Sequence, residues 1–422
     1  MTEQAETQTQ ATQESGAPQQ AAASAQEPKK QNFPPAAPVP TQKGPTGIQY
    51  DFNDGCRVLV DEGQWRIRIS DLDTGNILFE TQFGKGWVNS TKRYYVRYRL
   101  EVWSGEQALL QHDYDARDRD VLVLLPVGTL GDTLGWLPYA VKFQQQHQCR
   151  LTLGMAAVLI PLFKEVYPDI NFISHEDVKA ENYYATYRIG LFFDDEACVH
   201  QPCDFRLVGL HRTAGYILGV DPNEQPPKIH LPDASRPIPE PYVCIATQST
   251  CQSKYWNNPH GWREIVQFLK QHGYRVICID QKPVHGHNIV WNHIPYGAED
   301  QTGNIPLPER ARWLKHAAFF IGLSSGLSWL AWAMEIPVVM ISGITHPTNE
   351  FHTPYRIINY HVCNSCWNDV RVRFDHHDFL WCPRQKDTPR QFECTRLITP
   401  DAVKNVIRTI PGFGGKKIEA AV

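Results

Sequence analysis

The stretch that most constrains the fold is residues 319–341, where two apolar runs flank a short serine-glycine turn. Residues 319–323 are continuously apolar, the turn is Ser324-Ser325-Gly326, and residues 337–341 form the second run after a helix-like stretch. A strand, turn, helix and strand in this order belong in a parallel sheet. The turn then lies at the carboxyl end of its strand, where backbone N–H groups at a helix start can bind an anion such as a phosphate. The alternative is that the serines only cap the helix.

A second unit of the same kind begins at residues 121–127, an apolar strand followed by glycine-rich sequence and a helix to about residue 146. Further apolar runs at 150–153, 170–173 and 188–193 predict more strands of one parallel sheet. Prolines then crowd residues 226–241, and another strand–helix series starts at residue 242. Two α/β domains joined by this hinge predict a ligand cleft between them.

The sequence before residue 119 has a different character. Residues 1–46 are polar, low in complexity and then proline-rich, which predicts a disordered tail. Residues 47–118 contain short alternating runs such as Trp65-Arg66-Ile67-Arg68-Ile69, which predict a β-rich domain. We therefore expect the tail, the β-rich domain, and two Rossmann-like domains at 119–232 and 233–422.

Composition limits the partners of the chain. A formal charge of −4 gives no electrostatic reason to expect nucleic acid or an anionic membrane surface. The sequence contains no apolar run of the ~18 residues that a membrane span needs, and residues 1–31 have no apolar core of a secretory signal. We expect a cytoplasmic protein whose 11 cysteines are thiols or metal ligands.

Two polar residues stand out at predicted strand ends. Asp132 follows the first parallel strand, where a carboxylate can act as general base towards a hydroxyl group, although capping of the helix is the commoner role. Lys254 lies in the loop after the first strand of the second domain and can reach a diphosphate held by the Ser-Ser-Gly turn. A loop lysine by itself is usually only solvated.

The most specific local pattern is the spacing Cys363-x2-Cys366-x15-Cys382-x11-Cys394. Four thiolates can enclose one tetrahedral zinc or iron ion, and no ligand position is left open, so the metal would be structural. Chance spacing of buried cysteines is the alternative. Cys198 and Cys203 form a weaker pattern that we interpret as incidental.

In this order, the segment from Gly131 to Pro138, the Lys254 loop and the segment from Ser324 to Ala331 resemble the heptosyltransferase group of GT-B glycosyltransferases. The β-rich region and the four cysteines resemble more closely the bacterial autotransporter heptosyltransferases. The resemblance covers about residues 48–410. It implies a GT-B fold of two Rossmann-like domains, with an N-terminal β-rich domain and a four-cysteine metal segment at 363–394.

The resemblance also implies a function: transfer of heptose from ADP-heptose onto serine hydroxyls of an autotransporter adhesin, in the cytoplasm. Asp132 would be the general base, and Thr129, Leu130 and Gly131 would line the sugar. Lys254, Ser324, Ser325 and Gly326 would hold the diphosphate, with help towards the nucleotide from Thr247, Gln248, Thr250 and Asp280. The four cysteines would hold one structural iron ion (Fe³⁺) per subunit, with zinc as the alternative. The subunits would form a homo-oligomeric ring, a dodecamer by resemblance.

One departure bears on the acceptor. Lipopolysaccharide-type heptosyltransferases usually carry Asp-Thr-Gly and a histidine where this chain has Ser324-Ser325-Gly326 and Trp329. This difference favours a protein acceptor. The alternatives are a lipopolysaccharide-type or other nucleotide-sugar glycosyltransferase, and a catalytically silent assembly scaffold.

Overall fold

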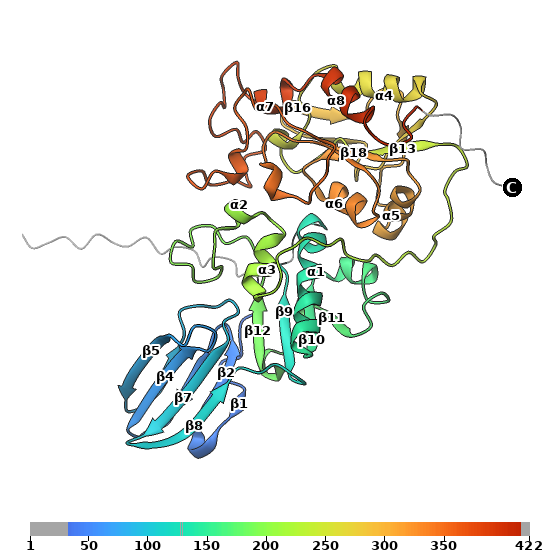
Figure 1. The fold of residues 1–422 in the computed structure, drawn as a ribbon. Coiled ribbons are helices and arrows are strands. Elements are labelled where there is room, and N and C mark those ends of the chain that lie inside the picture. Colours follow the sequence, from blue (N-terminus) through green and yellow to red (C-terminus); the bar gives the residue numbers. More distant parts are fainter. Residues whose placement is uncertain (1–32, 127, 129, 415–422) are drawn as a thin grey trace, which may run out of the picture. The chain divides into compact units, whose positions relative to one another are not determined.

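The computed structural model describes residues 33–126, 128 and 130–414. Figure 1 shows their strands and helices, which include sheets of eight, six, four and two strands. The predicted tail, residues 1–46, lies mostly outside this range. Its part from residue 33 onward is ordered rather than disordered, because the buried Arg57 guanidinium donates hydrogen bonds to the carbonyls of Ala37 and Val39.

The eight-stranded sheet has the order β11-β10-β9-β12-β2-β3-β6, with β1 also paired to β2. Strands β9 to β12 are mutually parallel, and β2 runs parallel to β12. The N-terminal strands are therefore continuous with the first α/β sheet, and hydrogen bonds cross the predicted boundary at residue 118. The bounds are β1 Gln42–Lys43, β2 Gln49–Asn53, β3 Arg57–Val60, β6 Gly86–Asn89, β9 Asp120–Leu124, β10 Arg150–Met155, β11 Ile170–Ser174 and β12 Ala185–Arg188.

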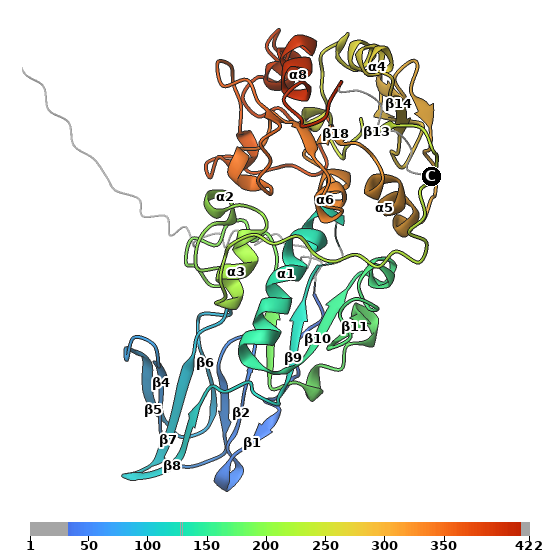
Figure 2. The same ribbon diagram turned by 45° about the vertical axis from the view of Figure 1, so that its right-hand side comes forward.

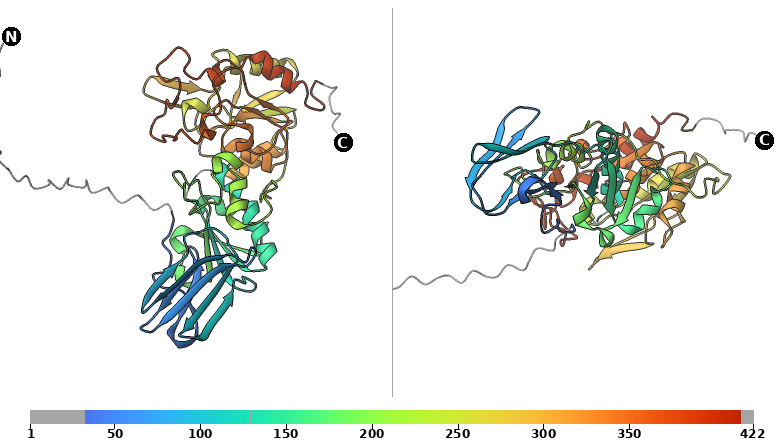
Figure 3. Two further views of the ribbon diagram at one scale, coloured as in Figure 1. Left: turned by 60° about the vertical axis from the view of Figure 1, so that its left-hand side comes forward. Right: turned by 90° about the horizontal axis from the view of Figure 1, so that it is seen from below.

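The other N-terminal strands form a separate antiparallel sheet in the order β5-β4-β7-β8, labelled in Figure 1. Figure 3 shows this sheet in blue from two further sides. They are β4 Trp65–Asp71, β5 Ile77–Phe83, β7 Tyr98–Ser104 and β8 Gln107–Asp113. In β4 the alternation predicted from sequence is confirmed: Trp65, Ile67 and Ile69 are buried while the two arginines between them are not. One face of this sheet thus packs into the core, as period-2 patterning requires.

Helix α1, Leu130–His147, follows β9 as predicted and covers the first sheet with α3, Arg212–Leu218, while α2, Phe205–Val208, precedes α3 (Figure 2). The strand predicted at 188–193 is wrong, since β12 ends at Arg188. Leu191 and Phe192 instead pack against the core from an irregular segment, where Phe192 stacks on His200. Apolar side chains alone did not distinguish packed coil from strand.

The six-stranded sheet is entirely parallel in the order β17-β14-β13-β18-β19-β20. Counted along the chain this order is 3-2-1-4-5-6, the arrangement of Rossmann sheets. The strands are β13 Tyr242–Ile245, β14 Arg275–Cys278, β17 Glu299–Asp300, β18 Phe320–Leu323, β19 Val338–Ile341 and β20 Arg356–Ile357. The helices are α4 Gly261–Gln271, α5 Leu307–Lys315, α6 Gly326–Ala333, α7 Glu393–Arg396 and α8 Pro400–Ile407.

The remaining elements are short. Strands β15 Val284–His287 and β16 Val290–His293 form a hairpin outside the main sheets. Short 3₁₀ helices lie at Pro45–Gly47, Ala157–Leu162, His175–Asp177, Ala180–Asn182, Gln252–Lys254, Pro347–Asn349 and Cys366–Asn368. Within the described residues, every helix is too short or too polar to cross a bilayer.

Gly209 yields a test of the packing between α2 and the loop after β19. Its φ of +101° and ψ of 154° lie in a region that only glycine populates, and an added Cβ would lie 2.1 Å from the carbonyl oxygen of Thr348. We expect Gly209→Ala to destabilise the protein by roughly 3 kcal/mol or more, since strain and overlap add. Gly75→Ala, at φ +73° with no atom within 4 Å, should cost only ~1 kcal/mol. Thermal unfolding of both variants measures the difference, and equal shifts would contradict the close contact.

Candidate functional site

The two parallel sheets each have a point where the strand order reverses, and ligands of such sheets bind at the carboxyl ends of the strands there. In the first sheet this point lies between β9 and β12, and in the second between β13 and β18. The loops that leave these strands carry Asp132, the segment around Lys254, and the Ser-Ser-Gly turn. Topology therefore places these three segments at the carboxyl ends of the strands that flank the two reversal points.

Asp132 lies in the first turn of α1 and is half-buried. A Cβ added at Gly128 would lie 3.8 Å from its Oδ2 atom, so the carboxyl group faces the glycine loop after β9. Leu130 and Gly131, predicted to line a sugar, begin the same helix. Thr129, the third residue of that prediction, lies outside the described residues.

The start of α1 packs directly against the start of α6. A Cβ at Gly131 would lie 2.8 Å from Trp329 Cδ1, and a Cβ at Gly326 would lie 3.2 Å from the Gly131 nitrogen. Only residues without side chains allow this approach. The Asp132 turn and the Ser-Ser-Gly turn are therefore neighbours, which is the juxtaposition that a transferase site requires.

The two serine hydroxyl groups of the Ser-Ser-Gly turn have different surroundings. Ser324 is buried, and its Oγ donates a short hydrogen bond to the carboxylate of Glu350. Ser325 is the N-cap of α6, and its side chain forms no capping hydrogen bond. The first N–H groups of α6 have no acceptor within the helix, so this turn can bind an anion.

The loop after β13 is held from behind by Asp280. Its Oδ2 accepts hydrogen bonds from the backbone N–H (2.8 Å) and Oγ1 (3.0 Å) of Thr247, and its Oδ1 accepts one from the Gln248 N–H (3.2 Å). Burial raises the pKa of Asp280, and these hydrogen bonds oppose that effect. Asp280 thus shapes the loop, while Gln248 is half-buried and Thr250 is exposed.

Lys254 lies in the 3₁₀ turn Gln252–Lys254, and its Nζ sits 5.5 Å from the centre of the Trp367 ring. Trp367 belongs to the cysteine-rich segment, next to Cys366. The geometry joins Lys254 to that segment by a cation–π contact. No hydrogen bond between Lys254 and the Ser-Ser-Gly turn exists among the described residues.

The four cysteines of the 363–394 segment are all free thiols. Burial, and after it the neighbouring thiols, raise the pKa of Cys366 and of Cys394 to about 12. The four thiols are thus close enough to influence one another. Across the described part of the chain, however, no three histidine, cysteine or acidic side chains converge as ligands of one ion do. The donor set fits a thiolate-preferring metal, but its geometry is not that of an assembled centre.

Sequence reasoning missed a set of contacts around Glu224. Its Oε2 accepts from the fully buried His211 (Nε2, 2.9 Å), and its Oε1 accepts from the backbone N–H of His352 at 2.9 Å. Burial by itself raises the pKa of Glu224, but these hydrogen bonds together with the charges of His211 and Arg212 outweigh it and lower the pKa. The His211 ring in turn packs edge-on against Trp329 at 5.5 Å. No local pattern in the sequence indicates such long-range contacts.

Comparison with known families agrees with this geometry. Residues 44–106 match the family described as glycosyltransferase TibC, N-terminal domain, and residues 218–373 match glycosyltransferase family 9 (heptosyltransferase). The crystal structure of the iron-containing dodecameric glycosyltransferase TibC from enterotoxigenic E. coli superposes with a TM-score of 0.86 at 55% identity, covering 89% of this chain and 98% of that one. A dodecameric iron-containing TibC in complex with ADP-D-β-D-heptose gives a TM-score of 0.85 at 55% identity, over 90% and 98%.

Curated relatives extend along most of the chain. The autotransporter heptosyltransferase TibC of Escherichia coli is 56% identical over 374 residues, covering 88% of this chain and 92% of its own length. BimC of Burkholderia thailandensis, named an inactive autotransporter heptosyltransferase, is 49% identical over 383 residues, covering 90% of each. A heptosyltransferase of Citrobacter rodentium named BAHTCr is 58% identical over 371 residues, covering 87% and 90%. At this identity and coverage, the chain belongs to the autotransporter heptosyltransferase family.

Proposed function

We propose that this glycosyltransferase moves heptose from ADP-heptose onto serine hydroxyl groups of an autotransporter adhesin. The observation that carries the proposal is the direct packing of the Asp132 turn on the Ser-Ser-Gly turn, through Gly131, Gly326 and Trp329. One turn offers a carboxylate and the other an anion site. A reaction between a hydroxyl and a sugar diphosphate needs both within reach of one carbon atom.

In the proposed reaction, the serine oxygen forms a bond to the anomeric carbon of heptose as the bond from that carbon to the diphosphate oxygen breaks. Asp132 takes the proton of the serine hydroxyl, and ADP leaves with the electron pair of the broken bond. Negative charge develops on the diphosphate. Fixed donors stabilise that charge best when they are oriented before the reaction begins.

The donor side of the site supplies such groups. We assign the diphosphate to the N–H groups at the start of α6, with Ser325 and Lys254, and the sugar to Thr129, Leu130 and Gly131. Thr247, Gln248 and Thr250 lie on the loop after β13 and would face the nucleotide. Asp280 and Ser324 act indirectly, because the Asp280 side chain already binds the Thr247 loop and the Ser324 side chain already binds Glu350.

Cys363, Cys366, Cys382 and Cys394 would hold one iron ion, as Fe³⁺, because thiolate sulfur suits iron and the TibC relative is described as iron-containing. Zinc is the alternative. When bound, the ion supplies a structural cross-link and no chemistry to the transfer. We also infer from the dodecameric relative that the subunits assemble into a ring, and we place the reaction in the cytoplasm, before secretion of the adhesin.

Two other functions are distinguished by experiment. A catalytically silent assembly scaffold is favoured by one observation, the relative that is named inactive. A lipopolysaccharide-type transferase would use a lipid acceptor, and parallel assays with purified adhesin and lipid acceptor separate it from the protein-modifying enzyme.

Asp132→Asn tests the enzyme directly. Removing a general base should slow transfer by roughly 10²- to 10⁴-fold, whereas the affinity for ADP-heptose and the thermal stability should stay close to those of the parent protein. Mass spectrometry of an autotransporter passenger co-expressed with each variant counts the added heptose units and locates them on serine.

The matched control is Asp120→Asn, which changes a carboxylate at the opposite, N-terminal end of β9. Asp120 pairs with Arg150 on the surface, so this variant should transfer heptose at the parent rate. If Asp132→Asn modified the passenger as fully as the parent, or if the parent added no heptose, the proposed function would be wrong.

Metal content tests the cysteine assignment. Protein purified without oxygen should contain about one iron per chain by elemental analysis, and Cys382→Ser or Cys394→Ser should lower that content towards zero. Because metal binding stabilises the folded segment, these variants should also unfold at lower temperature. Cys198→Ser with Cys203→Ser serves as the control and should keep the metal. Loss of the metal from this control variant, or the absence of stoichiometric metal in the parent protein, would refute the assignment.

A further inference from the structure

A carboxylate lies behind the Ser-Ser-Gly turn, where a negative charge is least expected. Glu350 is 2% exposed and follows the 3₁₀ turn Pro347–Asn349. It accepts a short hydrogen bond from Ser324 Oγ, one from Asn349 Nδ2 at 3.1 Å, and one from Arg356 Nη2 at 2.7 Å. Every donor to this carboxylate thus comes from the protein interior.

Such a carboxylate needs compensation. A buried charge is costly unless it is paired and hydrogen-bonded, and a bound diphosphate would add repulsion across the turn. Arg356 provides the counter-charge, since its side chain is 8% exposed and pairs with the 1% exposed side chain of Glu350. Buried ion pairs contribute little net stability compared with apolar packing. The pair therefore invites an explanation other than stability of the fold.

The explanation lies in the geometry of the turn. Because the Ser324 hydroxyl donates its hydrogen bond to Glu350, the Ser324 side chain cannot turn towards the ligand. A second hydroxyl, that of Ser328, donates to the Leu323 carbonyl and fixes the other side of the same turn. The backbone N–H groups of Ser325 and Gly326 and the Ser325 hydroxyl are then left to face an anion.

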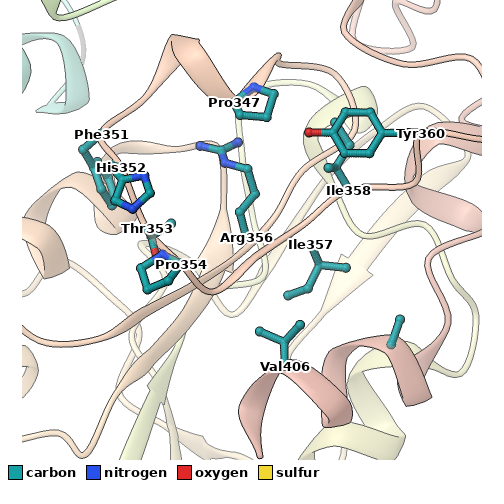
Figure 4. Close-up of a pocket in the computed structure, with 11 residues that line it drawn as sticks. Pro347, Phe351, His352, Thr353, Pro354, Arg356, Ile357, Ile358, Tyr360 and Val406 are labelled. Carbon is teal, nitrogen blue, oxygen red and sulfur yellow. The ribbon is translucent and has the colours of Figure 1, made fainter. Parts of the chain in front are cut away.

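Arg356 itself has only one nitrogen engaged. Its Nη1 atom is buried and has no hydrogen-bond partner among the described residues. The side chain lines a cavity of about 430 Å³ that is otherwise bounded mainly by apolar residues such as Phe351, Ile357 and Val406. In Figure 4 the guanidinium points towards Pro347 and away from Val406. The hydrogen bond to Glu350 is therefore its principal restraint.

We propose that Glu350 is a positioning residue for the diphosphate-binding turn, with Arg356 as its counter-ion. The inference rests on the proposed function, in which this turn holds the diphosphate of the donor. Glu350 does not touch the donor. It holds the Ser324 side chain so that the N–H groups after it keep the orientation that a diphosphate needs.

The test is a double-mutant cycle read out by the affinity for ADP, measured by titration calorimetry on the full chain. Glu350→Ala and Ser324→Ala each remove one end of the same hydrogen bond, so each should weaken ADP binding about 5- to 30-fold. The affinity of the double variant for ADP should equal, within about twofold, that of the single variant that binds ADP more weakly. The effects do not add because the two residues interact. The KM for ADP-heptose should rise in parallel, with kcat at saturating donor within about threefold.

A purely structural role is separated by a matched control. Asp51 is another fully buried carboxylate paired with an arginine, Arg57, at 2.6 Å. Asp51→Ala should lower the unfolding temperature and leave the affinity for ADP unchanged. If it weakened ADP binding as much as Glu350→Ala, general destabilisation would account for the effect and the proposal would fail.

Further variants keep the positioning role testable and separate it from the proposed function. If Glu350→Ala does not fold, Ser324→Ala alone carries the test, since it removes one hydroxyl group, and unchanged ADP affinity there overturns the proposal. Lys254→Ala probes the proposed function separately. Weaker binding in Lys254→Ala with normal binding in the Glu350 and Ser324 variants would refute the positioning role alone. A parent protein that binds no ADP would refute the proposed function.

Discussion

The contact between the first turns of α1 and α6 is the interaction on which the rest of the site depends. Gly131 and Gly326 bring two helix starts within van der Waals distance, and the Trp329 ring covers the junction. Each α/β sheet could form its own switch-point crevice without the other. This contact brings the two crevices together, with the Asp132 carboxylate on one side and the Ser-Ser-Gly turn on the other.

Two buried carboxylates of the second α/β domain have similar surroundings. Asp280 and Glu350 are both buried, both accept hydrogen bonds from residues of the loops in front of them, and both have an arginine nearby, Arg310 and Arg356 respectively. The N–H groups of Thr247 and Gln248 donate to Asp280, whereas Glu350 accepts the Ser324 hydroxyl and leaves the first N–H groups of α6 without an acceptor in the helix. Donors that the protein orients in advance in this way are suited to an anionic group.

The sequence indicated the local units well and the long-range contacts poorly. The strand–turn–helix units around Asp132 and Ser324 were predictable because apolar periodicity and turn residues act over a few positions. In the structure both turns follow the carboxyl ends of parallel strands, β9 and β18. The hydrogen-bond partners of Asp280 and Ser324 were harder to predict from the sequence, since Thr247 and Glu350 are about thirty residues away.

The same distinction explains the other differences. Cysteine spacing indicated that four thiols would be neighbours, but the separation of their sulfur atoms depends on the path of the intervening loop. The strand predicted at 188–193 failed because its apolar side chains pack without pairing. Continuity of β2 with β12 could not be read from local pattern, since strand pairing joins residues more than 130 positions apart.

The hydrogen bonds of Glu224 have a consequence for the way the two Rossmann halves can move. Glu224 lies at the start of the connecting segment, yet it is anchored to His211 of one half and to the His352 backbone of the other. Any rotation that separated the two halves at this point would have to exchange the Glu224–His352 bond for water. Glu224 therefore acts as a latch between the halves, and the proline-rich residues 226–241 that follow it form a stiff connection.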